Sequence, residues 1–387
     1  SRYRPAAPYR RTAGKGSTHM EITVRTADLV KELALGQGVV EKKTTIPVLS
    51  NVLLEASDGK LSFTATDLEL GIQTSCPATV AKSGSTTLPA KKLLDYIRLL
   101  PEAEVAVKIG ENNSASIVCG RSRTRLAGMS RENFPELPKM PAVVTKIPAK
   151  QLVNAISKTI FAVANEESRY TLIGCLLVLR EESFLTVATD GHRLAYVETP
   201  TRLEGVSGEI RGLVPKKAMA ELVKLASEGG ESLQIEFATD ENHLFFRCGP
   251  RLLITRKLTG QFPDYDRVLP KEKHTILTLN RDETMAAVRR VSQFADDRSR
   301  AVRFELTDGE LKLAASGSDA GESEESIPVE YTGGKIKVGF NAQYVIDFLN
   351  VAETDAIELQ FKDEESAGQM ELSGQEGYDY RYVVMPM

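Results

Sequence analysis

The chain has 387 residues, with 49 Lys and Arg against 53 Asp and Glu and a formal net charge of −4 at pH 7. It contains no apolar run near the roughly 20 residues that a membrane helix needs, and no G-x-x-x-x-G-K-[ST] pattern for binding ATP in a P-loop. A protein that bound nucleic acid over its whole surface would be basic, so any such contact here must use a local patch.

The first 19 residues differ in composition from the rest of the chain. They include five basic residues and no acidic one, and Met20 follows them directly. Because they also lack hydrophobic periodicity, we interpret residues 1–19 as an expression-vector leader and exclude them from the fold prediction. Without them, 44 basic residues stand against 53 acidic ones, a net charge of −9. No secretory signal follows Met20, so we expect a cytoplasmic protein.

The four cysteines lie far apart in apolar, strand-like segments, at Cys76, Cys119, Cys175 and Cys248. They form no C-x-x-C pair, and no histidine stands at ligand spacing from them. The sequence therefore predicts reduced core residues, with no metal site and no cofactor.

The first unit, residues 20–142, is predicted to begin with a helix and to continue in short strands. The helix spans 26–35, because Leu29 and Leu33 share one face, and Thr26 is its expected N-cap. A basic loop follows at 42–47. Pro89 opens a second helix. Strands are predicted over 51–56, 60–66, 71–80, 86–88, 105–109, 116–119 and 124–129.

Two proline-rich linkers, at 133–141 and 260–270, separate three units. The second unit, residues 143–272, is predicted to have helices at 149–163 and 216–226, with strands at 172–179, 184–190, 233–237, 243–247 and 252–257 and a further pair between them. The third unit, residues 273–387, has predicted helices at 281–294 and 342–351 and strands at 302–306, 310–315 and the chain end. An acidic stretch occupies 322–325.

One sequence pattern recurs three times. Pro89 precedes an acidic residue at position 95, Pro215 precedes one at 221, and Asn341 precedes one at 347, a spacing of 126 both times. A fixed spacing is typical of a tandem structural unit. We therefore expect an α+β fold made of three copies of one domain, each with two helices packed on antiparallel sheets. Edge strands left open by each copy would pair within and between chains, giving a curved array that can close.

The outward face of the repeated helix is polar, because residues at i, i+4 and i+7 share one side of a helix. The three copies carry Lys91, Asp95 and Arg98; Lys217, Glu221 and Lys224; and Gln343, Asp347 and Asn350. A solvated helix face explains such a pattern in any single helix. Its recurrence in register keeps a functional role open beside that explanation.

Four features together resemble the beta sliding clamp family of the bacterial replicative DNA polymerase. They are the triple unit, Ala-Thr-Asp-Gly-His-Arg-Leu at 188–194, Phe-Pro-Asp-Tyr at 262–265 and Tyr-Val-Val-Met-Pro-Met at 382–387. The likeness covers residues 20–387. It implies DNA-clamp domains that close as a head-to-tail homodimeric ring, with helices lining the hole and sheets forming the rim. It also implies a non-catalytic processivity factor that encircles duplex DNA and tethers the replicative polymerase catalytic subunit.

The resemblance implies that basic residues of the inner wall contact DNA phosphates without reading bases, which permits sliding. The matching residues are Lys43, Lys91, Lys92, Arg98, Arg169, Tyr170, Lys216, Lys217 and Lys224. Lys43 stands where relatives often have arginine, and Glu166 lies near a position that is commonly neutral. The third unit's helix supplies no base, so the positive potential is expected to be uneven around the ring.

The resemblance further implies a pocket between the second and third units for short peptides. These come from polymerases, from the ATP-dependent clamp loader that would have to open the ring, and from mismatch-repair or ligase proteins. The matching residues are Leu172, Thr189, Gly191, His192, Arg193, Leu194, Pro263, Arg267, Val268, Asn341, Tyr344, Val383, Met385, Pro386 and Met387. Flexible methionines suit a site that accepts several sequences. Relatives commonly extend two residues further, so the Met387 carboxylate is expected beside the pocket rim.

Two other interpretations compete with this one. Asp190 and His192 could form a catalytic acid–imidazole pair, but no nucleophile or oxyanion site accompanies them. The first unit carries Ala-Thr-Asp-Leu-Glu at 65–69 without a histidine, which favours a repeated structural turn. A passive interaction scaffold would keep the peptide pocket and lose the basic inner face.

Overall fold

The computed structural model describes residues 19–40, 44–165, 172–319 and 321–387. The chain forms two compact units. The first ends at Pro138 and takes in Pro250–Leu252, and the second comprises Lys139–Gly249 and Leu253–Met387. The predicted leader lies outside the described residues, apart from His19.

The described residues of the first unit form strands of two sheets and two α-helices. One sheet has the strand order β5-β1-β7-β8-β9, and in the other β6, β2, β3 and β4 lie in that order. The strands are β1 (Met20–Arg25), β2 (Asn51–Ser57), β3 (Lys60–Thr66), β4 (Leu70–Pro77), β5 (Thr79–Lys82), β6 (Gly84–Pro89), β7 (Glu104–Ile109), β8 (Ala115–Cys119) and β9 (Ser122–Leu126). Helices α1 (Thr26–Gln37) and α2 (Ala90–Ile97) pack against each other, and α1 also packs on β3 and β4.

The second unit contains the rest of the strands and four helices. Its largest sheet has the order β14-β11-β12-β13-β25-β24-β23-β18, a second has β21-β20-β19-β22, and β10, β15, β16 and β17 lie side by side. The strands of the central part are β10 (Thr145–Pro148), β11 (Gly174–Arg180), β12 (Ser183–Thr189), β13 (Arg193–Pro200), β14 (Glu209–Pro215), β15 (Gln234–Thr239), β16 (His243–Cys248) and β17 (Arg251–Arg256). Those of the C-terminal part are β18 (Thr275–Asn280), β19 (Ala301–Thr307), β20 (Glu310–Gly317), β21 (Gly321–Pro328), β22 (Ile336–Asn341), β23 (Ala356–Phe361), β24 (Gly368–Leu372) and β25 (Asp379–Val384). The helices are α3 (Ala149–Ser157), α4 (Lys216–Ala226), α5 (Arg281–Ser292) and α6 (Ala342–Val351).

The threefold repeat is confirmed at the starts of three helices. Pro89, Pro215 and Asn341 are the N-cap residues of α2, α4 and α6. A proline there loses little, because the first N–H groups of a helix have no intrahelical partner. Asn341 instead accepts a hydrogen bond from the backbone N–H of Gln343 at 2.9 Å. The predicted helix bounds 216–226 and 342–351 match the structure.

Two local predictions were wrong, and one stretch without a predicted structure is a strand. Arg25 is the N-cap of α1, and the Thr26 hydroxyl instead binds the backbone of Pro101 and Ala103. Helix α3 ends at Ser157, and a short 3-10 turn at Ile160–Ala162 replaces the predicted continuation to 163. Thr159 lies two residues beyond this end, and its hydroxyl donates to the Ala155 carbonyl and competes with the helical pattern. The acidic stretch at 322–325 lies within strand β21.

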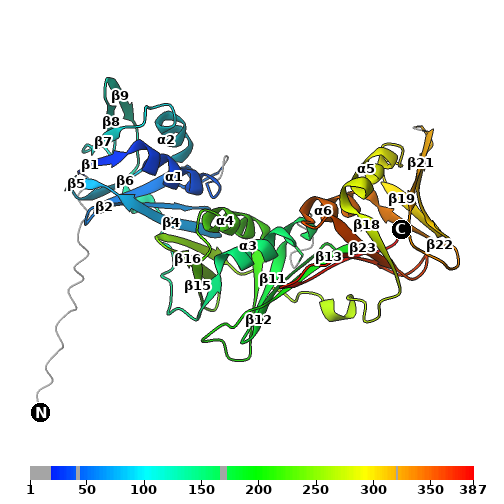
Figure 1. Cartoon of the computed structure of the whole chain (residues 1–387). Coiled ribbons are helices and arrows are strands. Elements are labelled where there is room, and N and C mark those ends of the chain that lie inside the picture. The colour runs from blue at the N-terminus through cyan, green and yellow to red at the C-terminus, as the bar shows by residue number, and fades with distance from the viewer. Residues whose placement is uncertain (1–18, 41–43, 166–171, 320) are drawn as a thin grey trace, which may run out of the picture. The chain divides into compact units, whose positions relative to one another are not determined.

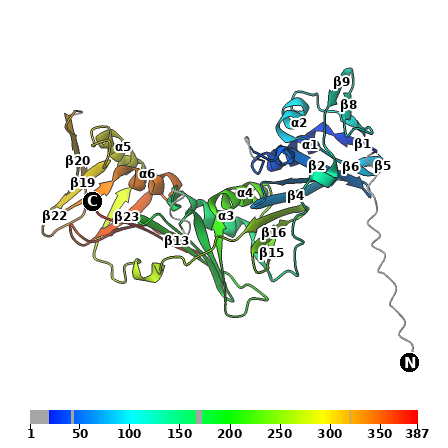
Figure 2. The ribbon, with the colours of Figure 1, turned by 180° about the vertical axis from the view of Figure 1, so that it is seen from behind.

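The helices and the linker cover opposite faces of the large sheet. Figures 1 and 2 show α3 and α4 on one side of β11 and β12, and the yellow-green linker segment on the other. The linker face is apolar, and Leu176, Leu194 and Val383 of the sheet cluster there with Tyr265 and Leu269 of the linker. This packing fixes the linker against the strands that carry the predicted peptide-binding residues.

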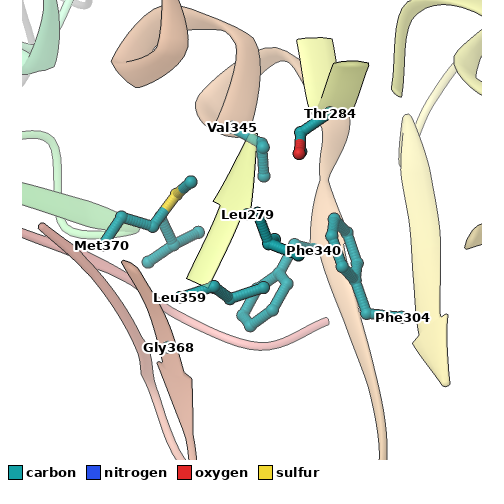
Figure 3. Close-up of a pocket in the computed structure, with 9 residues that line it drawn as sticks. Leu279, Thr284, Phe304, Phe340, Val345, Leu359, Gly368 and Met370 are labelled. Atoms are coloured by element: carbon teal, nitrogen blue, oxygen red, sulfur yellow. The ribbon is translucent and has the colours of Figure 1, made fainter. Parts of the chain in front are cut away.

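The C-terminal part has a tight apolar core with one small cavity. The rings of Phe304 and Phe340 meet edge to face at 5.4 Å. Gly368 is required there, because a Cβ would lie 2.5 Å from the Phe340 ring. The cavity shown in Figure 3 has room for about 10 Å³, roughly one water molecule, and Thr284 lines it. The Thr284 hydroxyl has no hydrogen-bond partner among the described residues.

The described residues contain neither a membrane helix nor a metal-binding cluster. None of the helices there is both long and apolar enough to cross a lipid bilayer. No three His, Cys, Asp or Glu side chains in that part of the chain gather closely enough to hold a metal ion. All four cysteines are buried thiols outside any disulfide.

We predict that two buried thiols make the protein less stable at alkaline pH. Burial raises the pKa of Cys76 and of Cys175 from 9.0 to about 12. Between these two pKa values the unfolded chain loses thiol protons that the folded chain keeps. The contribution of the thiols to the free energy of unfolding is therefore fully present below about pH 9 and is lost as pH rises. From pH 8 to pH 10 the loss should be about 1 kcal/mol per thiol. Urea unfolding of the wild type and of a Cys76→Ala, Cys175→Ala variant measures it, and equal losses in the two proteins would contradict it.

Candidate functional site

Helix α2 presents an exposed basic face in the first unit. Lys91, Lys92 and Arg98 are exposed, and Lys91 forms an ion pair with Asp95 at 2.6 Å. The opposite face of the helix is apolar and buried. The three basic side chains therefore lie on the solvent side of the helix, as the sequence predicts.

Helix α4 presents a similar face in the second unit, with one difference from the prediction. Lys217 and Lys224 are exposed, and the Lys216 ammonium donates to the Asn165 side chain at 3.0 Å. Glu221 does not share this solvated face, because it is only 4% exposed and accepts a hydrogen bond from Lys224 at 2.8 Å. The repeated acidic position is therefore buried in this copy, which corrects the predicted polar triplet.

Three of the predicted DNA contacts lie outside the described residues. These are Lys43, Arg169 and Tyr170, and the neighbouring Glu166 lies outside them as well. On α6 the equivalent exposed positions are Gln343 and Asn350, neither of which is charged. Among the three repeated helices, the described basic faces are thus those of α2 and α4.

The segment from Thr189 to Arg193 is a hydrogen-bonded turn between β12 and β13. The Asp190 carboxylate accepts from the backbone N–H groups of His192 at 2.9 Å and Arg193 at 3.1 Å. The Thr189 hydroxyl donates to the Arg193 carbonyl at 2.6 Å. Gly191 closes the turn with φ 91°, a backbone conformation that favours glycine.

The same turn occurs in the first unit without a histidine. Asp67 accepts from the backbone N–H groups of Glu69 at 3.0 Å and Leu70 at 2.7 Å, and Thr66 donates to the Leu70 carbonyl at 2.8 Å. His192 is exposed, and no hydrogen bond to its imidazole is described. The Asp190 carboxylate therefore serves a structural turn, as the repeat predicts.

Arg193 is buried at the centre of a polar network. Its guanidinium donates to Asp190 at 3.2 Å, to Asp347 at 2.5 Å and to the Phe161 carbonyl at 2.9 Å. It also lies over the Tyr344 ring, 4.4 Å from the centroid. The network joins the turn, the 3-10 segment after α3, and helix α6.

Tyr382 completes this network from strand β25. Burial raises the pKa of its hydroxyl, although Arg193 opposes the shift, so the hydroxyl remains a donor. It donates to the Tyr344 carbonyl at 2.8 Å. Tyr344 is thereby held at its main chain by Tyr382 and at its ring by Arg193.

The end of the chain extends alongside the turn. Leu194 pairs with Val383 in the ladder between β13 and β25. Beyond it the Met385 N–H donates to the His192 carbonyl and the Met387 N–H donates to the Gly339 carbonyl, both at 2.9 Å. The side chains of Met385 and Met387 are exposed. An apolar surface next to the turn is thus built partly from the chain end.

The structure brings most of the predicted peptide-binding residues into two neighbouring groups. The turn, the ladder and the chain end supply Thr189, Gly191, His192, Arg193, Leu194, Val383, Met385, Pro386 and Met387, and α6 adds Asn341 and Tyr344. The linker supplies Pro263, Arg267 and Val268, of which Arg267 pairs with Asp264 at 3.0 Å. Leu172 is buried, and its carbonyl accepts from the Ala164 N–H.

Three residues of this site were missed by the sequence analysis as site residues. Phe161, Asp347 and Tyr382 hold Arg193 and Tyr344 in place. Asp347 carried a signal, because it is the third member of the acidic repeat. Tyr382 also carried one, because it begins the motif at 382–387. Phe161 carried none, since its role depends on contacts between distant parts of the chain.

Family models match three consecutive parts of the chain. The N-terminal domain of the DNA polymerase III beta subunit matches residues 20–138, its central domain matches 146–264, and its C-terminal domain matches 266–387. The beta sliding clamp of Chlamydia muridarum is 35% identical over 362 residues, which cover 93% of this chain and 96% of that protein.

Solved structures agree with this match. The beta sliding clamp of C. crescentus has a TM-score of 0.89 at 34% identity and covers 97% of this chain and 100% of its own. A sliding clamp from Pseudomonas aeruginosa, solved bound to griselimycin, has a TM-score of 0.89 at 32% identity and covers 95% of this chain and 99% of its own.

We predict that the turn at 189–193 stabilises the fold through the Asp190 carboxylate. Asp190→Ala removes the acceptor of two backbone N–H groups and a partner of Arg193, so it should lower the free energy of unfolding by about 1–3 kcal/mol. Asp67→Ala should act in the same way in the first unit, whereas His192→Ala should change stability by less than about 0.5 kcal/mol. Urea unfolding curves of the three variants test this. A large loss with His192→Ala and none with Asp190→Ala would show that the turn is held differently.

Proposed function

Because the chain belongs to the DNA polymerase III beta subunit family, a family of non-catalytic sliding clamps, we propose that it closes as a head-to-tail homodimer around duplex DNA. In this proposal it tethers the replicative polymerase catalytic subunit for processive synthesis in the cytoplasm. An ATP-dependent clamp loader opens the ring, and other polymerases, mismatch-repair proteins and ligase bind the same pocket. The three domains are residues 20–142, 143–272 and 273–387.

The observation that carries the ring proposal is that one of two corresponding strand edges is paired and the other is not. In the large sheet, β13 is the last strand of the run β14-β11-β12-β13 that the central domain supplies. Its outer edge pairs with β25 of the next domain. The C-terminal domain has the corresponding run β22-β19-β20-β21. Its last strand, β21, has no neighbour on the outer edge among the described residues. An unpaired edge of this kind is a template for another strand.

The N-terminal domain offers the matching strand. In its sheet β9 is the terminal strand of the run β1-β7-β8-β9, and the C-terminal domain has the corresponding run β18-β23-β24-β25. Strand β9 therefore corresponds to β25, and β21 corresponds to β13. Pairing β9 of one copy with β21 of a second copy would repeat the contact that β13 and β25 make, and two such contacts close a symmetric dimer.

The charges of the two strands are complementary. Arg123 and Arg125 are exposed on β9, and Glu322 and Glu324 are exposed on β21. Opposite charges facing each other favour this partner, whereas like charges would disfavour pairing of two β9 or two β21 strands. The charge pattern supports a head-to-tail arrangement over a head-to-head one.

The basic faces of α2 and α4 support the DNA-binding part of the proposal. The whole chain has a formal net charge of −4, yet these two helix faces are positively charged. Helix α2 and its C-cap residue supply Lys91, Lys92 and Arg98, and α4 supplies Lys216, Lys217 and Lys224. Lys43, Arg169 and Tyr170 remain proposed contacts by family resemblance. Lysine and arginine attract phosphates through counterion release without specifying sequence. Such contacts hold duplex DNA and still allow movement along it.

The exposed methionines, the turn and Tyr344 support the peptide-binding part. They form a surface with a buried polar centre and a flexible apolar rim, the combination expected of a site for several related peptides. We also propose that griselimycin, which binds the Pseudomonas aeruginosa clamp, binds here in competition with partner peptides. A scaffold without DNA would need the peptide surface alone and would leave the two basic helix faces without a role.

We predict that the protein is retained on circular DNA and lost from linear DNA. Clamp is loaded on nicked circular plasmid with a clamp loader and ATP, and the plasmid is then cut once. A ring held by topology should remain on the circle in gel filtration and should leave the cut DNA by sliding off its ends. Equal retention on both forms would contradict encirclement.

Charge variants serve as controls for this experiment. Changing Lys91, Arg98, Lys217 and Lys224 to Glu should reduce loading by about ten-fold or more, because each lost phosphate contact reduces the counterion-release contribution. Peptide binding should be unchanged. Lys146→Glu with Lys271→Glu, both exposed and outside these helices in the sequence, should load normally.

We predict that charge reversal at β9 or β21 produces monomers that are rescued by mixing. Arg123→Glu with Arg125→Glu places like charges across both interfaces of a homodimer, and Glu322→Arg with Glu324→Arg does the same from the other side. Mixing the two variants leaves opposite charges at both interfaces, so a heterodimer should form.

Light scattering after size-exclusion chromatography measures the molar mass in each case. Lys108→Glu on β7, a strand inside the sheet, is the control and should remain dimeric. If both variants stay dimeric alone, or mixing yields no dimer, the β9–β21 contact is wrong.

A further inference from the structure

One of the predicted peptide contacts is a buried arginine whose guanidinium already has partners within the protein. Arg193 is 8% exposed, so little of it is open to a ligand. The other members of the turn, Gly191 and His192, are exposed beside it. A charged side chain with this little exposure needs internal partners to offset the loss of water.

The hydrogen bonds of Arg193 use nearly all of its donor capacity. A guanidinium has five N–H groups, and those of Arg193 donate to four different residues. Nε donates to Asp190 at 3.2 Å, Nη2 to the Phe161 carbonyl at 2.9 Å, and Nη1 to both Asp347 at 2.5 Å and the Tyr382 hydroxyl at 3.5 Å. Two rings also lie against the guanidinium, Tyr344 at 4.4 Å and Phe161 at 5.6 Å.

These partners come from separate parts of the second unit. Asp190 belongs to the turn before β13, whereas Asp347 and Tyr344 belong to α6, 154 residues further along the chain in the case of Asp347. Asp347 is held in turn by Gln343 at 2.8 Å. The arginine therefore fixes the position of α6 relative to the turn.

We infer that Arg193 is a positioning residue, which holds Tyr344 and the turn in the peptide-binding arrangement through Asp347 and does not pair with acidic groups of the peptide. This inference rests on the peptide-binding function proposed above. It assigns recognition to the groups around the arginine that solvent reaches, which are the half-buried Tyr344 and the exposed His192 and chain-end methionines. Affinity then depends on Arg193 for every peptide, whatever the charge of that peptide.

Arginine is suited to this role in a way that lysine is not. A planar fork with five fixed donors can bind two carboxylates and a carbonyl at once and stack on a ring. Lysine would keep the positive charge but would lose the fork. Positioning therefore requires arginine, whereas a simple charge contact with a peptide would tolerate lysine.

The test measures fluorescence polarisation with two labelled peptides. The first is copied from the clamp-binding segment of the polymerase catalytic subunit, and the second has each Asp and Glu of that segment replaced by Asn and Gln. We expect a similar loss of affinity for both peptides, about ten-fold, with each of three variants: Arg193→Ala, Arg193→Lys and Asp347→Asn. Arg180→Ala, which removes another ion-paired arginine of the same sheet, should weaken neither.

A double-mutant cycle shows whether Arg193 acts through Tyr344. Once Tyr344→Leu has removed the ring, Arg193→Ala should cost clearly less affinity than it does in the wild type. Circular dichroism checks that each variant is folded. If Arg193→Ala does not fold, the affinities of Asp347→Asn for the two peptides test the inference instead.

Three outcomes would overturn the inference. They are a loss confined to the acidic peptide, recovery of that peptide's affinity with Arg193→Lys, and full additivity with Tyr344→Leu. Failure of the wild type to bind either peptide would instead contradict the proposed peptide site, and would be seen before any variant is made.

Discussion

The pairing of β13 with β25 is the contact on which the candidate peptide site depends. Six residue pairs join Arg193–Glu198 to Asp379–Val384 in an antiparallel ladder. Backbone N–H and C=O groups at a sheet edge need partners, and this ladder supplies them while joining the central and C-terminal domains in one sheet. The turn and the chain end meet only because the ladder continues to the hydrogen bond between Met385 and His192.

The arrangement of helices and linker on the sheet separates surfaces of different charge. Helices cover one face of the large sheet and the linker covers the other (Figure 1), so the two faces can carry different chemistry. Basic residues gather on α2 and α4, while acidic residues occupy other exposed positions such as those of β21. A chain with negative net charge can therefore attract phosphate locally, because screening limits the reach of each charge to about 10 Å at ordinary ionic strength.

The sequence predicts the elements well where a local cause determines them. The caps at Pro89, Pro215 and Asn341 and the bounds of α4 and α6 follow from helix chemistry that acts within a few residues. Glu221 was predicted on a solvated face and is buried, because tertiary packing decides which edge of a helix is covered. Strand β21 was not predicted, since its alternating Glu and Ser lack the apolar residues that usually indicate a strand. The ion pair between Arg193 and Asp347 depends on the tertiary fold and leaves no local pattern.

The turn is a structural motif that recurs in the chain, and the proposed peptide site is built on one copy of it. A third copy lies between β15 and β16, where Asp240 accepts from the backbone N–H groups of Asn242 at 2.8 Å and His243 at 2.7 Å. Although partial desolvation opposes it, these two bonds lower the pKa of the Asp240 carboxyl, which keeps it a charged acceptor. The residue three positions after the aspartate differs in the three copies: Leu70, Arg193 and His243. Only the arginine reaches a carboxylate on a helix of another domain in the described contacts. The turn is therefore a backbone device common to all three places, and its proposed use in recognition depends on the one side chain that links it to α6.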